Sequence, residues 1–265
     1  EQKKLIQSSI SAPKSTNWIV QKKQLGTGHA VKQALPSLRA NSQAVVLYGD
    51  GPLVKISTLK KLIFDAAKNN LTLLTFESAN PKGLGRIIRE SNSKVSGIVE
   101  EKDASSSEKK IKEVNSGILA TSTKNLQQWL PKLRNKNASK EYYLTDIVAL
   151  CSSENKSIKA INLRETSELL GANDNRELQN LERIYQKETA LSFLKGGVKF
   201  ADINRVDFRG EVSIGKNVFI DINVVLEGKV TIGSDSIISA GAVIRNSSLS
   251  KKIKVEPYSV IENSK

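Results

Sequence analysis

The 265-residue chain contains no methionine, one cysteine and one histidine, and only 5% of its residues are aromatic. The single cysteine, Cys151, excludes an internal disulfide and agrees with a reducing compartment. The sequence has one histidine, His29, and no nucleophile elbow. These residues cannot form a Ser-His-Asp triad. Since an initiator methionine is also missing and the chain begins in a polar stretch, we expect a fragment of a longer protein.

Long hydrophobic runs are missing as well. Apolar runs such as residues 44–47 and 71–74 are far shorter than the ~20 residues that cross a bilayer, and no cleavable apolar segment stands at the start. We therefore expect no membrane insertion and a cytoplasmic location. The net charge of +14 is spread along the chain without a recognisable binding module, so we expect no nucleic acid partner. Attraction to phosphorylated substrates explains its sign, as does a general lysine bias.

Up to about residue 167, short apolar segments alternate with amphipathic helical patterns. This order is typical of an α/β fold with helices on both faces of a largely parallel sheet. We expect strands at residues 18–20, 44–48, 71–76, 97–100, 114–120 and 158–161. A helix is predicted over residues 57–69, with a serine cap and an apolar stripe of Leu59, Leu62, Ile63 and Ala66. Residues 86–90 and 94–100 predict an inserted hairpin, so the sheet is expected to be mixed.

One long helix is predicted over residues 174–195, and it is the natural link between two domains. Asp174 and Glu177 suit a capping box at its start, and Gly196 and Gly197 end it. Apolar residues recur near helical spacing along it: Leu178, Leu181, Ile184, Tyr185, Leu191 and Leu194.

Beyond Gly210 the sequence repeats every six residues. Aliphatic residues stand at Ile214, Ile220, Leu226, Ile232, Ile238 and Ile244, and two positions earlier stand Val212, Val218, Val224, Val230, Ser236 and Ala242. Short fixed-period repeats of this kind predict a parallel β-solenoid. Gly215 and Gly233 follow the aliphatic residue, where a tight corner would need glycine. The register slips after Ile244, and about three coils are expected.

Two segments of the first domain suggest binding chemistry. Residues 21–30 (QKKQLGTGHA) form a glycine-rich turn that opens a helix, an arrangement that offers free N–H groups to an anion or a base. Gln21 and Thr27 could read a base edge or a ribose, although Gly-Thr-Gly can also be a simple tight turn. His29 falls inside the start of the helix, which favours a structural role over that of a base.

Residues 45–53 (VVLYGDGPL) predict an apolar strand that ends in a carboxylate, Asp50. Ligands of open α/β sheets bind outside the carboxyl ends of the strands, so Asp50 is a candidate metal or phosphate-metal ligand. The alternative is that Asp50 only begins a turn, as strand-end aspartates commonly do.

These segments belong to a longer series of motifs. In order they are QLGTGHA at 24–30, YGDGPL at 48–53, GRI at 85–87, IVEEKD at 98–103, VNSG at 114–117, EYYLTD at 141–146 and GANDNR at 171–176. With the long helix and the six-residue repeats, the series resembles the family of bacterial bifunctional enzymes that combine N-acetylglucosamine-1-phosphate uridylyltransferase with glucosamine-1-phosphate N-acetyltransferase. The resemblance covers essentially the whole chain.

The resemblance implies roles for ten residues. It assigns Gln21, Gly26 and Thr27 to the uridine, and Tyr48, Gly49 and Asp50 to the nucleotide-sugar. It assigns Gly85, Glu100 and Asn115 to the N-acetylglucosamine moiety. Asp50 and Asn173 match the family's Mg²⁺ pair, and a carboxylate with an amide carbonyl suits this ion, which takes few ligands from protein.

The implied reaction is in-line attack by N-acetylglucosamine 1-phosphate on the α-phosphorus of UTP, which gives UDP-N-acetylglucosamine and pyrophosphate. Such a transfer needs positioning and charge neutralisation rather than a protein nucleophile, so no nucleophilic catalytic residue is expected. The parent enzyme would also use acetyl-CoA to acetylate glucosamine 1-phosphate, for peptidoglycan and lipopolysaccharide precursors, and would be a homotrimer.

Two departures from the family pattern accompany the match. No segment corresponds to the family's first strand and triphosphate-binding loop, and the solenoid stops before the residues used for acetyl transfer. The resemblance therefore implies three parts: residues 1–172 as an incomplete uridylyltransferase domain of the Rossmann-like nucleotide-diphospho-sugar transferase type, 173–197 as a linker helix, and 198–265 as the start of a left-handed parallel β-helix. Two alternatives stay open: an inactive fragment that binds ligand or forms trimers, and a nucleotidylyltransferase for another base or sugar.

Overall fold

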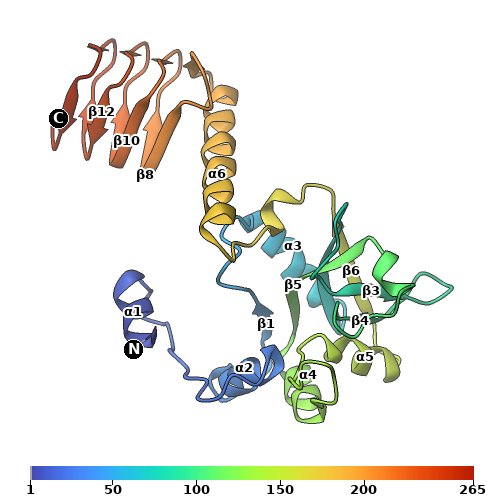
Figure 1. The fold of residues 1–265 in the computed structure, drawn as a ribbon. Helices are drawn as coiled ribbons and strands as arrows, with labels where there is room; N and C mark the ends of the chain where they lie inside the picture. The colour runs from blue at the N-terminus through green and yellow to red at the C-terminus, as the bar shows by residue number, and fades with distance from the viewer. Residues whose placement is uncertain (1) are drawn as a thin grey trace. The chain divides into compact units, whose positions relative to one another are not determined.

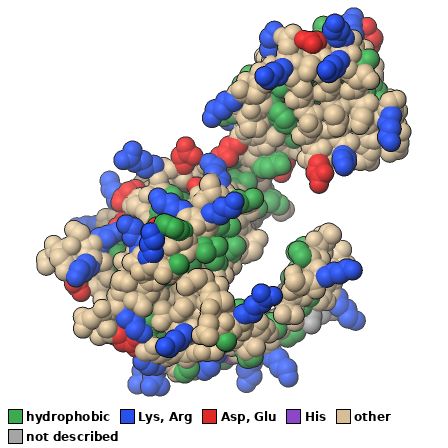
Figure 2. Space-filling model, turned by 180° about the vertical axis from the view of Figure 1, so that it is seen from behind, with side chains coloured by type: hydrophobic (Ala, Val, Ile, Leu, Met, Phe, Trp, Pro, Cys, Tyr) green, Lys and Arg blue, Asp and Glu red, His purple; other side chains and the backbone are tan. Residues whose placement is uncertain are grey.

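The computed structural model describes residues 2–265, with side chains from Lys4 onward. The chain forms two compact units, Glu1–Leu170 and Gly171–Lys265 (Figure 1). None of the helices in the described part of the chain is long and apolar enough to cross a membrane. On the face drawn in Figure 2, lysine and arginine side chains are scattered over both units and do not gather into one patch.

The first unit is built on one six-stranded sheet. Its strands are β1 (Gln43–Val46), β2 (Leu71–Glu77), β3 (Arg86–Arg89), β4 (Val95–Val99), β5 (Glu113–Ser122) and β6 (Ile158–Leu163). The order is β4-β3-β5-β2-β6, and β1 also pairs with β5. The strands β1, β2, β3 and β6 run in one direction and β4 and β5 in the other, because every pairing except β2 with β6 is antiparallel.

The sheet is therefore mixed, as expected, and four strands share a direction. Of these four strands, β2 and β6 pair with each other. The antiparallel strand β5 separates β2 from β1 and β3. The sequence of β5 could not reveal its direction. Residues 117–121 are all buried, and a fully buried strand shows no alternation that would set it apart from its neighbours.

Apolar side chains are buried on both faces of this sheet. Leu71, Leu73 and Leu119 pack with α4 (Thr123–Trp129) and α5 (Asp146–Ser153) in one cluster around the fully buried Trp129. Leu74, Ile118 and Ala120 pack with α3 (Ile56–Ala66) in another. The remaining helices of the unit are α1 (Gln2–Ser9), α2 (Thr27–Ala34) and four single 3₁₀ turns at Leu35–Ser37, Glu108–Lys110, Leu130–Lys132 and Ser167–Leu169.

Two local expectations were wrong. Residues 18–20 are not a strand: Ile19 is 45% exposed and Val20 is 51% exposed, so a short β-prone run here found no strand to pair with. The helix α3 begins at Ile56 without a serine cap. Its N-cap is Lys55, whose backbone N–H donates to Glu168 Oε2 at 3.0 Å, so a tertiary contact replaces the local cap.

The second unit begins with α6 (Asn175–Lys195). Asp174 caps it by accepting from Glu177 N at 2.7 Å, and Gly197 ends it with φ 94°. Its buried residues are Leu181, Gln186 and Ala190, whereas Leu178 and Tyr185 of the expected apolar stripe are exposed. Gln186 is buried because both atoms of its amide bond the backbone of Phe208, with Phe208 N donating at 2.7 Å and Phe208 O accepting at 3.0 Å. The helix thus satisfies backbone groups of the solenoid strand that contains Phe208.

The solenoid strands are β7 (Lys199–Phe200), β8 (Val206–Ile214), β9 (Phe219–Ile220), β10 (Val224–Ile232), β11 (Ile237–Ile238), β12 (Val243–Arg245), β13 (Ser248–Leu249), β14 (Lys254–Val255) and β15 (Val260–Glu262). All pairings among them are parallel. Val206 faces Val224, and Val225 faces Val243, so one coil takes 18 residues. The six-residue period is confirmed, since Ile220, Leu226 and Ile238 are completely buried in one core.

The last coil is one residue shorter, which explains the slip after Ile244. Val243 faces Val260 and Thr231 faces Ser248, both 17 positions apart. Asn246 makes the shorter path possible: it adopts φ 43°, and its side-chain Oδ1 accepts the hydrogen bond of Lys229 N at 3.1 Å. A side-chain oxygen thereby takes the place of a backbone carbonyl at this corner.

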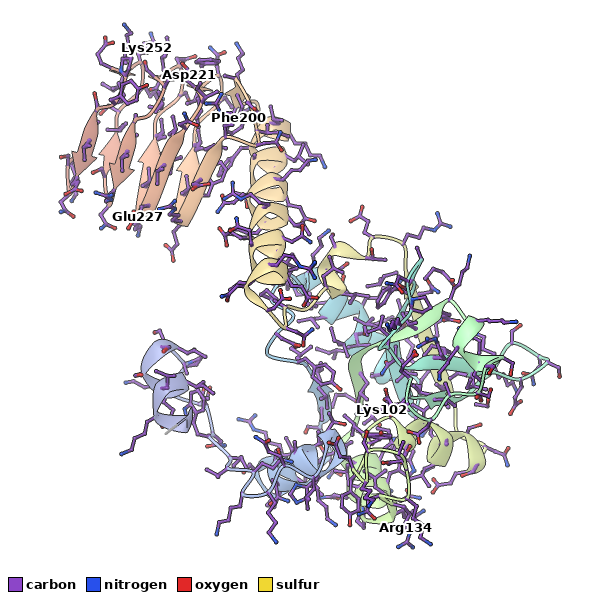
Figure 3. All side chains as sticks on the ribbon, in the orientation of Figure 1. Lys102, Arg134, Phe200, Asp221, Glu227 and Lys252 are labelled. Atoms are coloured by element: carbon purple, nitrogen blue, oxygen red, sulfur yellow. The ribbon has the colours of Figure 1, made fainter. Side chains whose placement is uncertain are left out.

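The outer corners of the coils carry polar side chains. Figure 3 shows Glu227 at one edge of the solenoid and Asp221 and Lys252 at the opposite edge. Glu227 forms an ion pair with Arg245 of the next coil, at 3.1 Å, and Arg245 also pairs with Glu262 of the coil after it. Gly215 and Gly233 stand at tight corners as expected, because a Cβ at either position would lie within 2.6 Å of the backbone of the next coil.

Candidate functional site

The loop that opens α2 is bonded to the segment that precedes α5. Three hydrogen bonds join them: Tyr142 N to Leu25 O at 2.8 Å, Gly28 N to Tyr142 O at 2.8 Å, and Leu144 N to Thr27 Oγ1 at 3.0 Å. Gly26 has φ 102°, and a Cβ there would lie 2.7 Å from Tyr142 O, so this position requires glycine. These hydrogen bonds and the close approach at Gly26 hold the glycine-rich turn in one conformation.

Gln21 is hydrogen-bonded to this turn. Its amide nitrogen lies 3.2 Å from Gly26 O and 2.9 Å from His29 Nδ1. The three residues that the sequence assigned to a nucleoside, Gln21, Gly26 and Thr27, are therefore neighbours at the start of α2.

Tyr48 follows β1 and lies across Gly117 of β5. A Cβ at Gly117, which has φ 81°, would overlap the Tyr48 ring. Burial raises the pKa of Tyr48, as do the charges of Glu100 and then Asp50, and a hydrogen bond with Thr27 lowers it. These interactions place Thr27, Tyr48, Glu100 and Asp50 in one neighbourhood, although they come from separate segments.

Gly85, Glu100 and Asn115 also lie together. Asn115 N donates to Gly85 O at 2.9 Å, and a Cβ at Gly85 would lie 3.3 Å from Glu100 Oε2 and 2.9 Å from Ile98 Cγ2. Glycine at position 85 therefore leaves room beside the Glu100 carboxylate. Gly49 lies in an exposed turn, where a Cβ would meet no atom within 4 Å.

Sequence reasoning missed two residues that hold this site in shape. The buried Thr145 donates its hydroxyl to Glu100 Oε1 at 2.8 Å, and Gly117 makes room for Tyr48. Both stand inside motifs that the sequence singled out, at 141–146 and 114–117, but only their contacts reveal what they do. Next to Thr145, the pKa of Asp146 is raised by burial and then by the charges of Glu100 and Asp103.

The two expected metal ligands lie in different units. Asp50 is exposed in the turn after β1, and Asn173 precedes α6 in the second unit. Within the first unit, Leu170 O lies 3.8 Å from the Cβ position of Gly51, the residue after Asp50. The amide nitrogen of Asn173 lies 3.2 Å from Glu177 Oε2, which turns its carbonyl oxygen away from that carboxylate. The described residues contain no cluster of three or more His, Cys, Asp or Glu that could hold a metal.

The family model "bacterial transferase hexapeptide (six repeats)" matches residues 211–246. A protein named "Bifunctional protein GlmU" from Baumannia cicadellinicola is 44% identical over 260 residues, 97% of this chain and 55% of that protein. Another of that name from Marinobacter nauticus is 43% identical over 94% of this chain and 55% of that protein. The resemblance seen in the motifs is confirmed, and the chain spans about half the length of these relatives.

A solved structure described as a glucose-1-phosphate thymidylyltransferase from Bacillus anthracis has a TM-score of 0.48 and 20% identity to this chain. The match covers 62% of this chain and 63% of that structure's chain.

Proposed function

We propose that this chain is part of a GlmU-type bifunctional enzyme. Its first unit would bind UTP and N-acetylglucosamine 1-phosphate and form UDP-N-acetylglucosamine, and its solenoid would belong to the acetyl-CoA-dependent acetyltransferase of the whole protein. One observation carries the proposal. Residues that the motifs assign to a single nucleotide-sugar form two groups, Gln21 with Gly26 and Gly85 with Glu100 and Asn115, and Tyr48 interacts with Thr27 and with Glu100.

The arrangement suits binding and positioning. The oxygen of the sugar phosphate would form a bond to the α-phosphorus of UTP while the bond from that phosphorus to the pyrophosphate oxygen breaks. Thr145 orients Glu100, whose carboxylate can accept hydrogen bonds from sugar hydroxyls beside the space that Gly85 leaves. Asn115 offers an amide to the same moiety. Holding both reactants in line supplies much of the rate of such a transfer.

Mg²⁺ is the ion we propose for Asp50 and Asn173. The donor set fits, because a carboxylate and an amide carbonyl are hard oxygen ligands and Mg²⁺ needs only one or two from protein. The ion, when bound, would neutralise phosphate charge.

The wider context of the proposal is that of the relatives. We propose a homotrimer assembled through the solenoid, a cytoplasmic location, and a role in precursors of peptidoglycan and lipopolysaccharide. The proposal includes no nucleic acid partner. The single cysteine, Cys151, is completely buried, and burial raises its pKa to about 12, so it is a packing residue rather than a nucleophile.

Calorimetry on the 265-residue chain tests the proposal. We expect UDP-N-acetylglucosamine to bind, Mg²⁺ to strengthen UTP binding, and Asp50→Asn to remove about tenfold of that strengthening, or ~1.4 kcal/mol. Asp65→Asn, which removes a carboxylate from α3, is the matched control and should keep the full Mg²⁺ effect. Equal Mg²⁺ effects in the two variants would contradict the metal assignment.

Glu100→Gln separates the sugar from the nucleotide. It should weaken UDP-N-acetylglucosamine while leaving UTP affinity unchanged, because only the sugar is assigned to Glu100. An equal loss for both ligands would show that Glu100 does not recognise the sugar. Preference for another sugar nucleotide would favour a related transferase, and binding without pyrophosphate release would favour a ligand-binding module.

A further inference from the structure

The only histidine of the chain stands in a line of hydrogen bonds that ends at the candidate nucleotide site. Its Nδ1 lies 2.9 Å from Gln21 Nε2, and its Nε2 lies 3.3 Å from Gln33 Nε2. Gln21 Nε2 also reaches Gly26 O at 3.2 Å. The order Gln33, His29, Gln21, Gly26 connects the outer part of α2 to its glycine-rich start.

The number of protons available determines which atom donates in each of these hydrogen bonds. The Gly26 carbonyl can only accept, so the atom of Gln21 that faces it must be the amide nitrogen. The same nitrogen faces His29 Nδ1, which must therefore be the bare, accepting nitrogen of a neutral ring. His29 Nε2 then carries the proton. Gln33 must accept from it through Oε1, so the oxygen and nitrogen of the Gln33 amide exchange places.

The surroundings hold the His29 ring in this position. His29 borders a pocket of about 450 Å³ together with Leu133 and Tyr142, and the His29 and Tyr142 ring centroids lie 6.4 Å apart. The hydrogen bond from Gly28 N to Tyr142 O, at 2.8 Å, joins Tyr142 to the start of α2. The ring is thus packed on one side and hydrogen-bonded at both nitrogens.

We propose that His29 is a positioning residue that makes Gln21 a pure hydrogen-bond acceptor toward the nucleobase. Both N–H groups of Gln21 are occupied, by Gly26 O and His29 Nδ1, so only Oε1 remains for a ligand. An acceptor oxygen placed against the N3 position of a pyrimidine pairs with the N3–H of uracil and opposes the lone pair at N3 of cytosine. The inference rests on the proposed function and explains how this chain would choose uridine over cytidine nucleotides.

Nuclear magnetic resonance tests the geometry without any activity. With one histidine in the chain, ¹⁵N-labelled imidazole signals are unambiguous. In the neutral ring we expect protonated Nε2 and unprotonated Nδ1. The reverse tautomer would overturn the proposal, because Nδ1–H could not accept from Gln21. In Gln21→Ala, the Nδ1 signal should move while the folded state persists.

Nucleotide discrimination tests the consequence. The ratio of UTP to CTP affinity should fall about tenfold in His29→Phe, which keeps a ring but loses the acceptor, the loss expected for one hydrogen bond. His29→Asn should restore most of the ratio, because its Oδ1 can accept in place of Nδ1. Lys32→Ala, on the same helix, controls for loss of charge and should keep the wild-type ratio.

A double variant separates positioning from general damage. In the Gln21→Ala background, His29→Phe should change the ratio no further, since the residue it orients is gone. An unchanged ratio in the single variant His29→Phe would overturn the role of His29 and leave the proposed function standing. A wild-type chain that binds neither UTP nor CTP would overturn both.

Discussion

The two units place their important residues by different means. In the solenoid, each residue stacks on the one 18 or 17 positions away, so its surroundings repeat along the chain. In the sheet unit, the contacts that shape the candidate site join unrelated segments: Thr27 to Leu144, 117 positions apart, and Thr145 to Glu100, 45 positions apart. A repeat determines a scaffold from local information, whereas a binding site depends on contacts that no local pattern contains.

Glycines show the same contrast. Gly215 and Gly233 are glycine because the next coil passes too close for a side chain, and the reason recurs with the period. Gly117 is glycine because the ring of Tyr48, 69 positions earlier, covers it, and its φ of 81° adds a second reason. The first kind maintains the stack, and the second shapes the candidate site.

The largest effect is expected from Leu226→Ala in the solenoid core. Leu226 is completely buried, so the cavity should cost about 2–5 kcal/mol in the free energy of unfolding. Denaturation followed by circular dichroism measures it, and Ile237→Ala, at a 45% exposed position, is the control with a much smaller cost. The reactivity of Cys151 toward a thiol reagent should stay at the wild-type level, because this residue reports only on the sheet unit. Earlier exposure of Cys151 would show that the units unfold together.

Gly117→Ala should disturb the candidate site while sparing the scaffold. The new Cβ would displace Tyr48 and occupy an unfavourable φ, so nucleotide-sugar affinity should fall about 10- to 100-fold, the equivalent of ~1–3 kcal/mol. Calorimetry with UDP-N-acetylglucosamine measures this loss. Gly97→Ala in β4, where a Cβ meets no atom within 4 Å, should bind like the wild type. Similar losses in the two variants would mean that Tyr48 does not contribute to binding.

Glu154→Gln should have the smallest effect, and one that depends on pH. Hydrogen bonds from Lys132, then Lys156 and Trp129, lower the pKa of Glu154 to about 2. Because the folded value lies below the unfolded value of 4.5, its stabilisation is complete above about pH 4.5 and is lost as the pH falls toward 2. The variant should be less stable at pH 7, and its stability should fall less steeply below pH 4.5.

Urea denaturation of the sheet unit at several pH values, followed by tryptophan fluorescence, measures this slope. Glu90→Gln in the β3–β4 hairpin controls for the loss of one negative charge. An identical acid slope in Glu154→Gln and the wild type would show that Glu154 gains nothing from its three partners.

The sequence allowed the solenoid to be predicted almost residue by residue, because its core residues recur every six positions along the chain. Through motifs that resemble a known family, the sequence also assigned binding roles to residues such as Gln21, Tyr48 and Glu100, and these roles stay predictions. The start of α3 could not be predicted, since its first backbone N–H is satisfied by Glu168, far along the chain. The buried face of α6 was missed for a similar reason: a polar residue, Gln186, is its centre, and only Phe208 explains why.

The corner at Asn246 bears on how such a protein can change over generations. Because a side-chain oxygen there stands in for a backbone carbonyl, the coil loses a residue and the strands on either side keep their partners. Deletions of one residue are therefore compatible with the stack where an asparagine can occupy the left-handed corner, whereas inside a strand they would turn every following side chain to the wrong face. The corners are the places where the length of this repeat can be edited.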